Sequence, residues 1–236
     1  MPDSTDLDGL RNELQKGDKV AQSRIDKLSS GLRQSRGKDR SEEPIDLVNQ
    51  FGRPTGLVAP RWLCHLLGLR HCCAHVLLWW HSERLCRTLV LQMRSWSKPD
   101  SPGLIDISVG GHAKSGISVE DTAYSEMAEE LGVRPKYLVG NRLESVGGYE
   151  HYNERKEGRF HNAEWRAVFV GELPTDNLSK IGFNDDEVVG LYLCSVRQAA
   201  ALLEQTDRIA SALKCSLPKV LEYWGIPVKE PTAPGS

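Results

Sequence analysis

The sequence predicts an α/β fold in which strands alternate with helices. Segments rich in branched and aromatic residues recur through the middle of the chain. An amphipathic helix separates two groups of them, and two further helical segments follow near the end. Strands interrupted by helices that must cover both faces of a sheet indicate a layered α/β domain. With 236 residues, the chain is long enough for one domain with appendages.

The individual elements follow from local patterns of apolar residues. Helices are expected from about 119 to 131, from about Ser195 to Ala212 and from Leu217 to Trp224. Strands are expected at Cys73–Trp80, Arg87–Arg94, Leu104–Val109, Lys136–Val146, Glu164–Leu173 and Glu187–Val196.

The two ends of the chain differ from the middle in composition. Residues 1–43 are charged and lack aromatic residues, and their leucines recur at helical intervals. This segment is expected to be either a docking or dimerising arm or a loosely ordered tail. A dimerising arm would make the protein a homodimer. Residues 44–228 are expected to form the domain, and residues 229–236 a disordered tail.

Composition excludes several classes of function. The net charge is −2, which argues against general nucleic-acid binding. There is no apolar run of 18 residues and no basic segment followed by an apolar one at the start, so we expect a cytoplasmic protein without a membrane partner. The six cysteines show no C-x-x-C spacing and are expected to be buried thiols. The histidines are scattered and predict no metal site.

An acidic helix is the most informative segment. Ser118 and Asp121 have the spacing of a capping box, and Gly132 marks the end of the helix. Glu126, Glu129 and Glu130 stand at i, i+3 and i+4, so their carboxylates share one face.

This acidic face requires a positive partner. Like charges at i,i+4 repel, and carboxylates near a helix C-terminus also meet the negative end of the dipole. No Lys or Arg occurs from Ile117 to Val133. A divalent cation satisfies clustered carboxylates, and Mg²⁺ is the usual choice beside phosphates. The alternative is a solvated charged face, which is the ordinary explanation of such runs.

The surrounding residues resemble the Nudix hydrolases. Their signature, G-x5-E-x7-R-E-U-x-E-E-x-G-U with U bulky and apolar, aligns without a gap. Gly111 takes the first position, Glu126 the E of "RE", Met127 the first U, Glu129 and Glu130 the "EE", Gly132 the G and Val133 the last U.

The resemblance implies a Nudix-type α/β/α sandwich with a mixed β-sheet, and hydrolysis of a small-molecule diphosphate such as a nucleoside diphosphate derivative. It implies Mg²⁺ or Mn²⁺ held by Gly111, Glu126, Glu129 and Glu130. Glu126 and Glu130 are catalytic candidates. Glu164 is a further candidate for the base, because the related branch often has a carboxylate there, with a solvent-facing strand residue as the alternative.

Basic residues beside the signature are candidates for binding the substrate. Arg94 and Lys98 follow the strand that leads into it, so they are expected either to contact phosphate or to be surface charges.

Two positions depart from the signature. Ile117 replaces its first Glu, and Ser125 replaces its Arg. In the family these two side chains typically pair and brace the loop and helix. Losing both removes an ion pair without leaving a buried unpaired charge, which would be the costly outcome. A non-catalytic nucleotide-binding Nudix module therefore remains an alternative.

The resemblance extends to the branch that includes isopentenyl-diphosphate isomerase and its hydrolase relatives. The turn from Asn49 to Gly56, the stretch from His65 to His71 and the segment "LQMRSWSKPDSPGLIDISVGGH" resemble that branch, with Asn49 in place of its Asp and Ile105 in place of its Trp. The isomerase uses a cysteine as its acid, where this chain has Val109 and Gly110. Isomerase activity is therefore the least favoured alternative.

Overall fold

The computed structural model describes two compact units. The described residues are 9, 11, 13–14, 19–35, 40–83, 86–98, 101–155, 160–174, 179–183 and 187–227. The first unit consists of Met1–Ala74, His112–Thr122 and Gly148–Ala167. The second consists of His75–Gly111, Ala123–Gly147 and Val168–Ser236. The tail expected at 229–236 lies outside the described residues.

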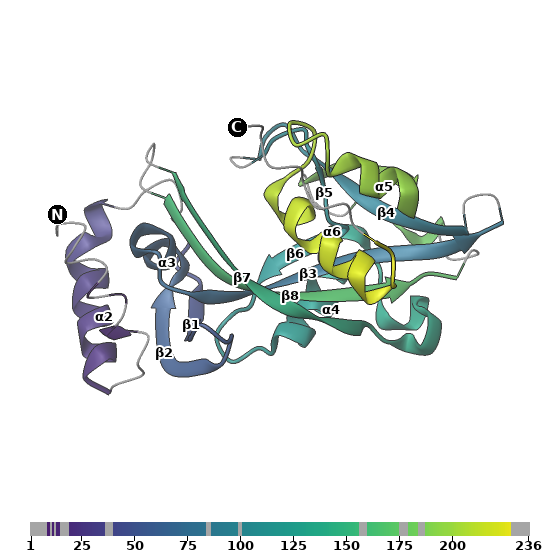
Figure 1. Ribbon diagram of the computed structural model, residues 1–236. Coiled ribbons are helices and arrows are strands. Elements are labelled where there is room, and N and C mark those ends of the chain that lie inside the picture. Colours follow the sequence, from purple (N-terminus) through teal and green to yellow (C-terminus); the bar gives the residue numbers. More distant parts are fainter. Residues whose placement is uncertain are drawn as a thin grey trace. The chain divides into compact units, whose positions relative to one another are not determined.

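Helices and strands alternate along the described chain (Figure 1). The α-helices are α2 (Lys19–Leu32), α3 (Arg61–Leu67), α4 (Val119–Leu131), α5 (Val196–Leu202) and α6 (Ser211–Tyr223). The strands are β1 (Pro44–Val48), β2 (Pro54–Pro60), β3 (His71–Ser82), β4 (Cys86–Arg94), β5 (Ile105–Asp106), β6 (Val109–His112), β7 (Glu144–Arg155), β8 (Phe160–Glu172) and β9 (Val188–Ser195). Backbone pairing links these nine strands into a mixed sheet, so the α/β class is confirmed.

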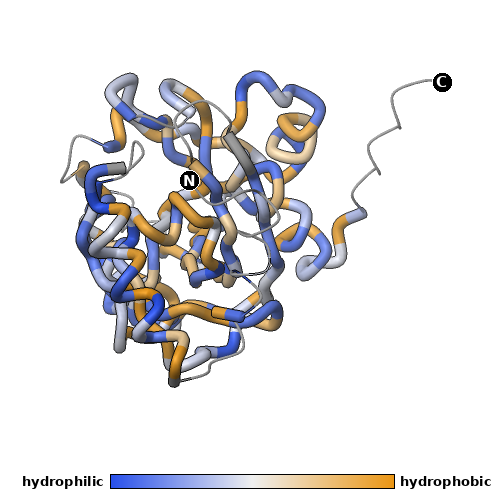
Figure 2. The backbone as a smooth tube through the Cα atoms, turned by 90° about the vertical axis from the view of Figure 1, so that its left-hand side faces the viewer, coloured by the Kyte–Doolittle hydropathy of each residue, from blue (hydrophilic) through white to orange (hydrophobic). Residues whose placement is uncertain are grey.

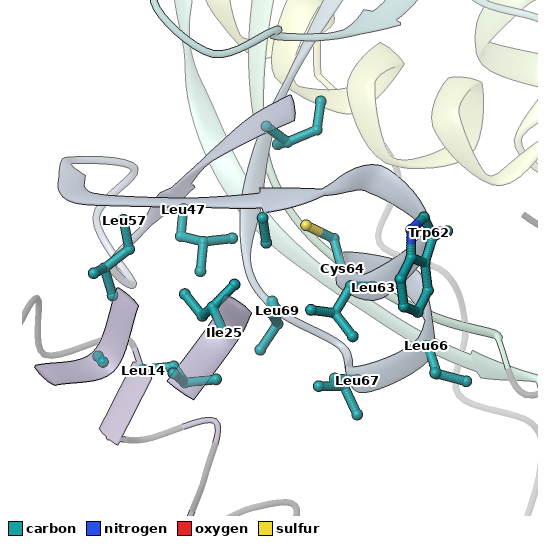
Figure 3. Packing of buried hydrophobic residues seen from close by; sticks show 13 residues of the cluster. Leu14, Ile25, Leu47, Leu57, Trp62, Leu63, Cys64, Leu66, Leu67 and Leu69 are labelled. Atoms are coloured by element: carbon teal, nitrogen blue, oxygen red, sulfur yellow. The ribbon is translucent and has the colours of Figure 1, made fainter. Parts of the chain in front are cut away.

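The first unit has a core built by α2, β1, β2 and α3. β1 and β2 pair antiparallel, with Ile45 opposite Ala59. Figure 3 shows Ile25 of α2 beside leucines of the two strands and of the segment after α3. Since Leu14 and Ile25 are almost fully buried in this cluster, part of residues 1–43 packs into the core of the first unit.

A side chain of α2 also extends the hydrogen bonding of strand β2. The Gln22 amide nitrogen donates to the Val58 carbonyl at 3.0 Å, and its oxygen accepts from the Val58 N–H at 2.9 Å. The amide thus bonds to this strand as a neighbouring peptide group would. Because unpaired strand edges invite aggregation, α2 protects this edge.

The second unit is organised around β4. This strand pairs antiparallel with β3, β5 and β9, for example Val90 with Leu78 and with Leu193. Figure 2 shows apolar stretches, in orange, alternating with hydrophilic ones along the backbone. Leu89, Val90 and Leu91 are all fully buried, as expected for a central strand covered on both faces.

Several predicted elements have the wrong bounds. The single strand expected at Leu104–Val109 is divided between β5 and β6. The strand expected at Lys136–Val146 begins only at Glu144, after two 3-10 turns at Pro135–Tyr137 and Val139–Asn141. Gly140 and Asn141 both have positive φ, which a strand does not permit.

The helix expected from Ser195 to Ala212 ends at Leu202, because the backbone of Arg208 and Ala210 instead bonds to Ile105 of β5. The last helix, expected to begin at Leu217, begins at Ser211 and continues through Pro218. Its apolar stripe, Leu213, Leu217 and Val220, is fully buried on both sides of the proline, so packing outweighs the lost hydrogen bond.

Candidate active site and metal centre

The acidic helix α4 begins where the capping box predicts. The Ser118 hydroxyl oxygen accepts from the Asp121 backbone N–H at 3.0 Å. The Asp121 carboxylate accepts from the Ser118 hydroxyl at 2.7 Å instead of reaching back to a backbone N–H. At the other end, Gly132 takes a φ of 65° and the Val133 N–H bonds to the Met127 carbonyl. The helix is therefore fixed at both ends by local bonds.

The three glutamates of the acidic face of α4 differ in exposure. Glu129 is exposed, Glu126 is partly buried, and Glu130 is only 4 % exposed. Met127 and Leu131, on the opposite face, are fully buried. A carboxylate as buried as Glu130 requires compensation of its charge.

Gly111 and Glu126 provide the test of whether a cation fits. A Cβ built at residue 111 would lie 2.2 Å from the Glu126 carboxylate carbon and oxygen. The backbone and the carboxylate therefore approach more closely than any side chain at 111 would allow. The contact brings together Gly111 and Glu126, two of the four expected ligands, and carboxylate and backbone carbonyl oxygens are the ligands that hard cations prefer. That Glu129 and Glu130 share a Mg²⁺ or Mn²⁺ ion with them stays a prediction.

A second candidate metal centre lies in the first unit. It consists of His65 of α3, His71 of β3, His112 of β6 and Glu164 of β8, whose ligand atoms all lie within 4.8 Å of one another. We call this the His/Glu cluster. His71 and His112 are stacked with ring centroids 5.1 Å apart, and His65 meets both rings at 5.2 Å. Three imidazoles and one carboxylate form a ligand set typical of zinc and similar transition metals.

Two histidines of this cluster, His71 and His112, are neutral at pH 7. Burial and the neighbouring imidazoles lower the pKa of His71 to about 3. Burial lowers the pKa of His112 to about 4, despite its contact with Glu164. His71 Nδ1 lies 2.8 Å from the Leu69 carbonyl and therefore carries the proton, while its buried Nε2 has no hydrogen-bond partner in the described chain. A ring oriented through one nitrogen with a lone pair on the other is poised to bind a metal.

Glu164 is buried, so the alternative of a solvent-facing strand residue is wrong. It is 4 % exposed, its Oε2 lies 2.6 Å from Arg166 Nε, and its Oε1 lies 3.5 Å from His112 Nε2. Burial alone would raise its pKa, but Arg166 and the bond with His112 hold the pKa well below its usual range. Glu164 is therefore ionised and already paired with a buried cation.

Cys73 also lies beside this carboxylate. Burial and the Glu164 charge raise the pKa of its thiol well above the ordinary value. Cys73 is thus a protonated thiol next to an ionised carboxylate.

Arg94 and Lys98 are both engaged in ion pairs. Arg94 Nη1 lies 2.9 Å from Asp106 Oδ2, and Lys98 pairs with Glu187. These ion pairs favour the alternative that the two residues are structural or surface charges. Phosphate binding by either residue stays a prediction.

Sequence reasoning missed most of the His/Glu cluster. It treated His71 and His112 as scattered and His65 only as part of a matching stretch. The three lie far apart in sequence, and the fold brings them together at a helix and two strand ends. The available signal was the stretch from His65 to His71 considered together with His112, which follows the glycines of the signature.

Comparison with known proteins identifies the family. The family model described as NUDIX domain matches residues 74–214, more than half of the chain. The chain belongs to the Nudix family. The predicted Nudix-type sandwich is thereby confirmed, and the solved structure of DR0079 from Deinococcus radiodurans shares the fold. That structure has a TM-score of 0.56 and 18 % identity, over 75 % of this chain and 98 % of DR0079.

Two relatives of this Nudix protein place it more finely. Nudix hydrolase 3 of Arabidopsis thaliana is 32 % identical over 55 % of this chain, which spans only 16 % of the length of that relative. The isopentenyl-diphosphate Delta-isomerase of Nocardia farcinica is 32 % identical over 56 % of this chain and 70 % of its own length. The predicted resemblance to the isomerase branch is thus confirmed. None of the described helices is both long and apolar enough to cross a membrane.

Proposed function

We propose that this Nudix protein hydrolyses a diphosphate linkage in a nucleoside-diphosphate-type or related small molecule. The observation that carries the proposal is the close approach of Gly111 to Glu126 on a helix that also bears Glu129 and Glu130. These four residues would hold the metal. A bound divalent cation would neutralise the phosphate oxygens and lower the pKa of a water molecule.

The chain's own residues supply the remaining requirements. Glu126 is our candidate for the base that accepts the proton of the attacking water, because it is partly exposed and belongs to the signature. Glu164 is a weaker candidate, since its lowered pKa and its bond to Arg166 reduce its basicity.

The His/Glu cluster would hold a second divalent ion. The support is the distance of at most 4.8 Å among its ligand atoms and the proton position on His71. Such an ion would fix the two strand ends and helix α3 that carry the histidines. Expression with supplemented zinc should give bound metal that the His71→Asn variant loses.

A panel of diphosphate compounds tests the hydrolase. Wild-type protein with Mg²⁺ or Mn²⁺ should release phosphate or nucleotide from at least one compound. Glu129→Gln and Glu130→Gln should abolish the release, because each removes a negative ligand from the same helix face. No turnover above the Glu130→Gln control would refute the proposal.

Two observations favour a second candidate, isomerisation of isopentenyl diphosphate to its allylic isomer. Cys73 lies beside Glu164, and the Nocardia relative carries an isomerase name. Including isopentenyl diphosphate in the panel, with separation of the allylic product, decides the matter. Product formation that disappears in Cys73→Ser would support this candidate, whereas hydrolysis unaffected by Cys73→Ser supports the first.

A further inference from the structure

The segment that leads into α4 lacks the ion pair that would brace it. We call residues 113–118 the entry loop. Ile117 and Ser125, which stand where the family signature has Glu and Arg, are both exposed and uncharged. Nothing in the signature itself therefore fixes the start of the glutamate helix.

Asp46 of β1 contacts this loop through both of its carboxylate oxygens. Oδ1 accepts from the Ser115 hydroxyl at 2.6 Å, and Oδ2 accepts from the Gly116 backbone N–H at 2.9 Å. Hydrogen bonds to an ionised acceptor are shorter and about twice as strong as neutral ones. The two bonds hold adjacent residues, so they fix both the position and the direction of the loop.

The same strand adds backbone bonds to the loop. The Ser115 N–H donates to the Pro44 carbonyl at 2.8 Å, and Ile45 forms a bridge with Lys114. Gly116 has a φ of 79°, so the chain turns at the residue whose backbone N–H donates to the Asp46 carboxylate.

The loop in turn fixes the helix. The Ile117 N–H donates to the Lys114 carbonyl at 3.0 Å, which closes the turn before the cap. Ser118 then caps α4, and the Thr122 hydroxyl and N–H both bond to the Ser118 carbonyl at 2.9 Å. A continuous series of hydrogen bonds thus runs from Asp46 to the first turn of α4.

We propose that Asp46 is a positioning residue that takes over the bracing role of the absent Glu/Arg pair. It acts through the entry loop on the orientation of α4 and so on the glutamates the helix carries. This inference rests on the proposed hydrolase function for its effect on rate. The bracing itself is a property of the fold that is measurable without substrate.

The test compares Asp46→Ala and Asp46→Asn with a matched control on the same strand pair. The Thr55 hydroxyl donates to the Leu47 carbonyl at 2.8 Å, so Thr55→Val removes a bond to β1 without touching the entry loop. Asp46→Asn keeps the shape of the side chain, removes its charge and replaces one of its two acceptor oxygens with a donor NH2 group. Hydrogen exchange of residues 113–122, Mn²⁺ affinity, kcat and KM are measured for each folded variant.

We expect Asp46→Ala to speed exchange across residues 113–122 and to lower kcat by about 10- to 100-fold, with KM changed less than about threefold. The exchange rates and kcat of Asp46→Asn should lie between those of Asp46→Ala and the wild type. Thr55→Val should have the exchange rates and kcat of the wild type. Adding Ile117→Glu with Ser125→Arg to Asp46→Ala should restore most of kcat, because it rebuilds the pair of the signature.

Wild-type exchange in Asp46→Ala, or equal impairment in Thr55→Val, would overturn the proposal. Failure of the rebuilt pair to restore kcat would overturn the claim that Asp46 replaces it. If the wild type hydrolysed nothing, the hydrolase proposal would fail, and the exchange rates would still decide whether Asp46 braces the loop.

Discussion

Gly111 shows how a single missing side chain shapes the acidic site. Its backbone lies against the Glu126 carboxylate so closely that a methyl group would fall 2.2 Å from it. Heavy atoms at that distance overlap, so either the glutamate or the backbone would have to move. Glycine is thus required at position 111 because a Cβ atom there would collide with Glu126, and not because of its φ angle.

Gly111→Ala should therefore weaken both metal binding and stability. We expect at least about tenfold weaker Mn²⁺ affinity, and about 1–3 kcal/mol lost from the free energy of unfolding as in other overpacked sites. Gly190→Ala is the control, because the nearest atom to its added Cβ is Met93 Sδ at 3.7 Å. Calorimetry and urea denaturation measure the two effects. Wild-type affinity in Gly111→Ala would show that this contact is unimportant.

The cysteines differ in burial and should therefore differ in their reactivity toward thiol reagents. Cys86 is exposed, whereas Cys73 and Cys194 are buried, and burial raises the pKa of Cys194 to about 12. Since only the thiolate reacts, Cys86 should react quickly with Ellman's reagent at pH 8 while the other two stay protected until the protein unfolds. The expectation of buried thiols is thus wrong for Cys86. Rapid reaction of Cys194 in the folded protein would contradict the structure.

Helix α2 lies in the segment 1–43, for which the sequence allowed either a docking arm or a loosely ordered tail. Its Ile25 is 1 % exposed within the core of the first unit, while Val20 on the same helix is 66 % exposed. Ile25→Ala should lower the free energy of unfolding by about 2–4 kcal/mol, because it leaves a cavity. Val20→Ala should change it by less than about 0.5 kcal/mol. Equal effects of the two substitutions in urea denaturation would indicate a loosely attached helix.

The elements also show what sequence could and could not predict. The acidic helix has local signals at both ends, so its bounds were predictable from Ser118 and Gly132 alone. The helix after Ser195 was predicted too long because its end depends on backbone bonds to Ile105, about 100 residues away. The His/Glu cluster escaped for the same reason, since no local period joins His71, His112 and Glu164.

The whole molecule combines two candidate metal centres of different chemistry. The acidic face of α4 offers oxygen ligands, and the His/Glu cluster offers three imidazole nitrogens and one carboxylate. Hard cations prefer the first set and transition metals the second. The two centres should therefore be separable by mutation.

Mn²⁺ binding followed by calorimetry tests whether the acidic face of α4 holds a metal ion. The wild type should show two classes of site, one weakened in Glu130→Gln and the other lost in His71→Asn. Glu120→Gln is the control, because Glu120 lies exposed in the first turn of the same helix. We expect Glu120→Gln to bind as the wild type does and Glu130→Gln to lose at least about tenfold in affinity at the acidic site. Wild-type binding by Glu130→Gln would contradict the assignment of the acidic face as the metal site.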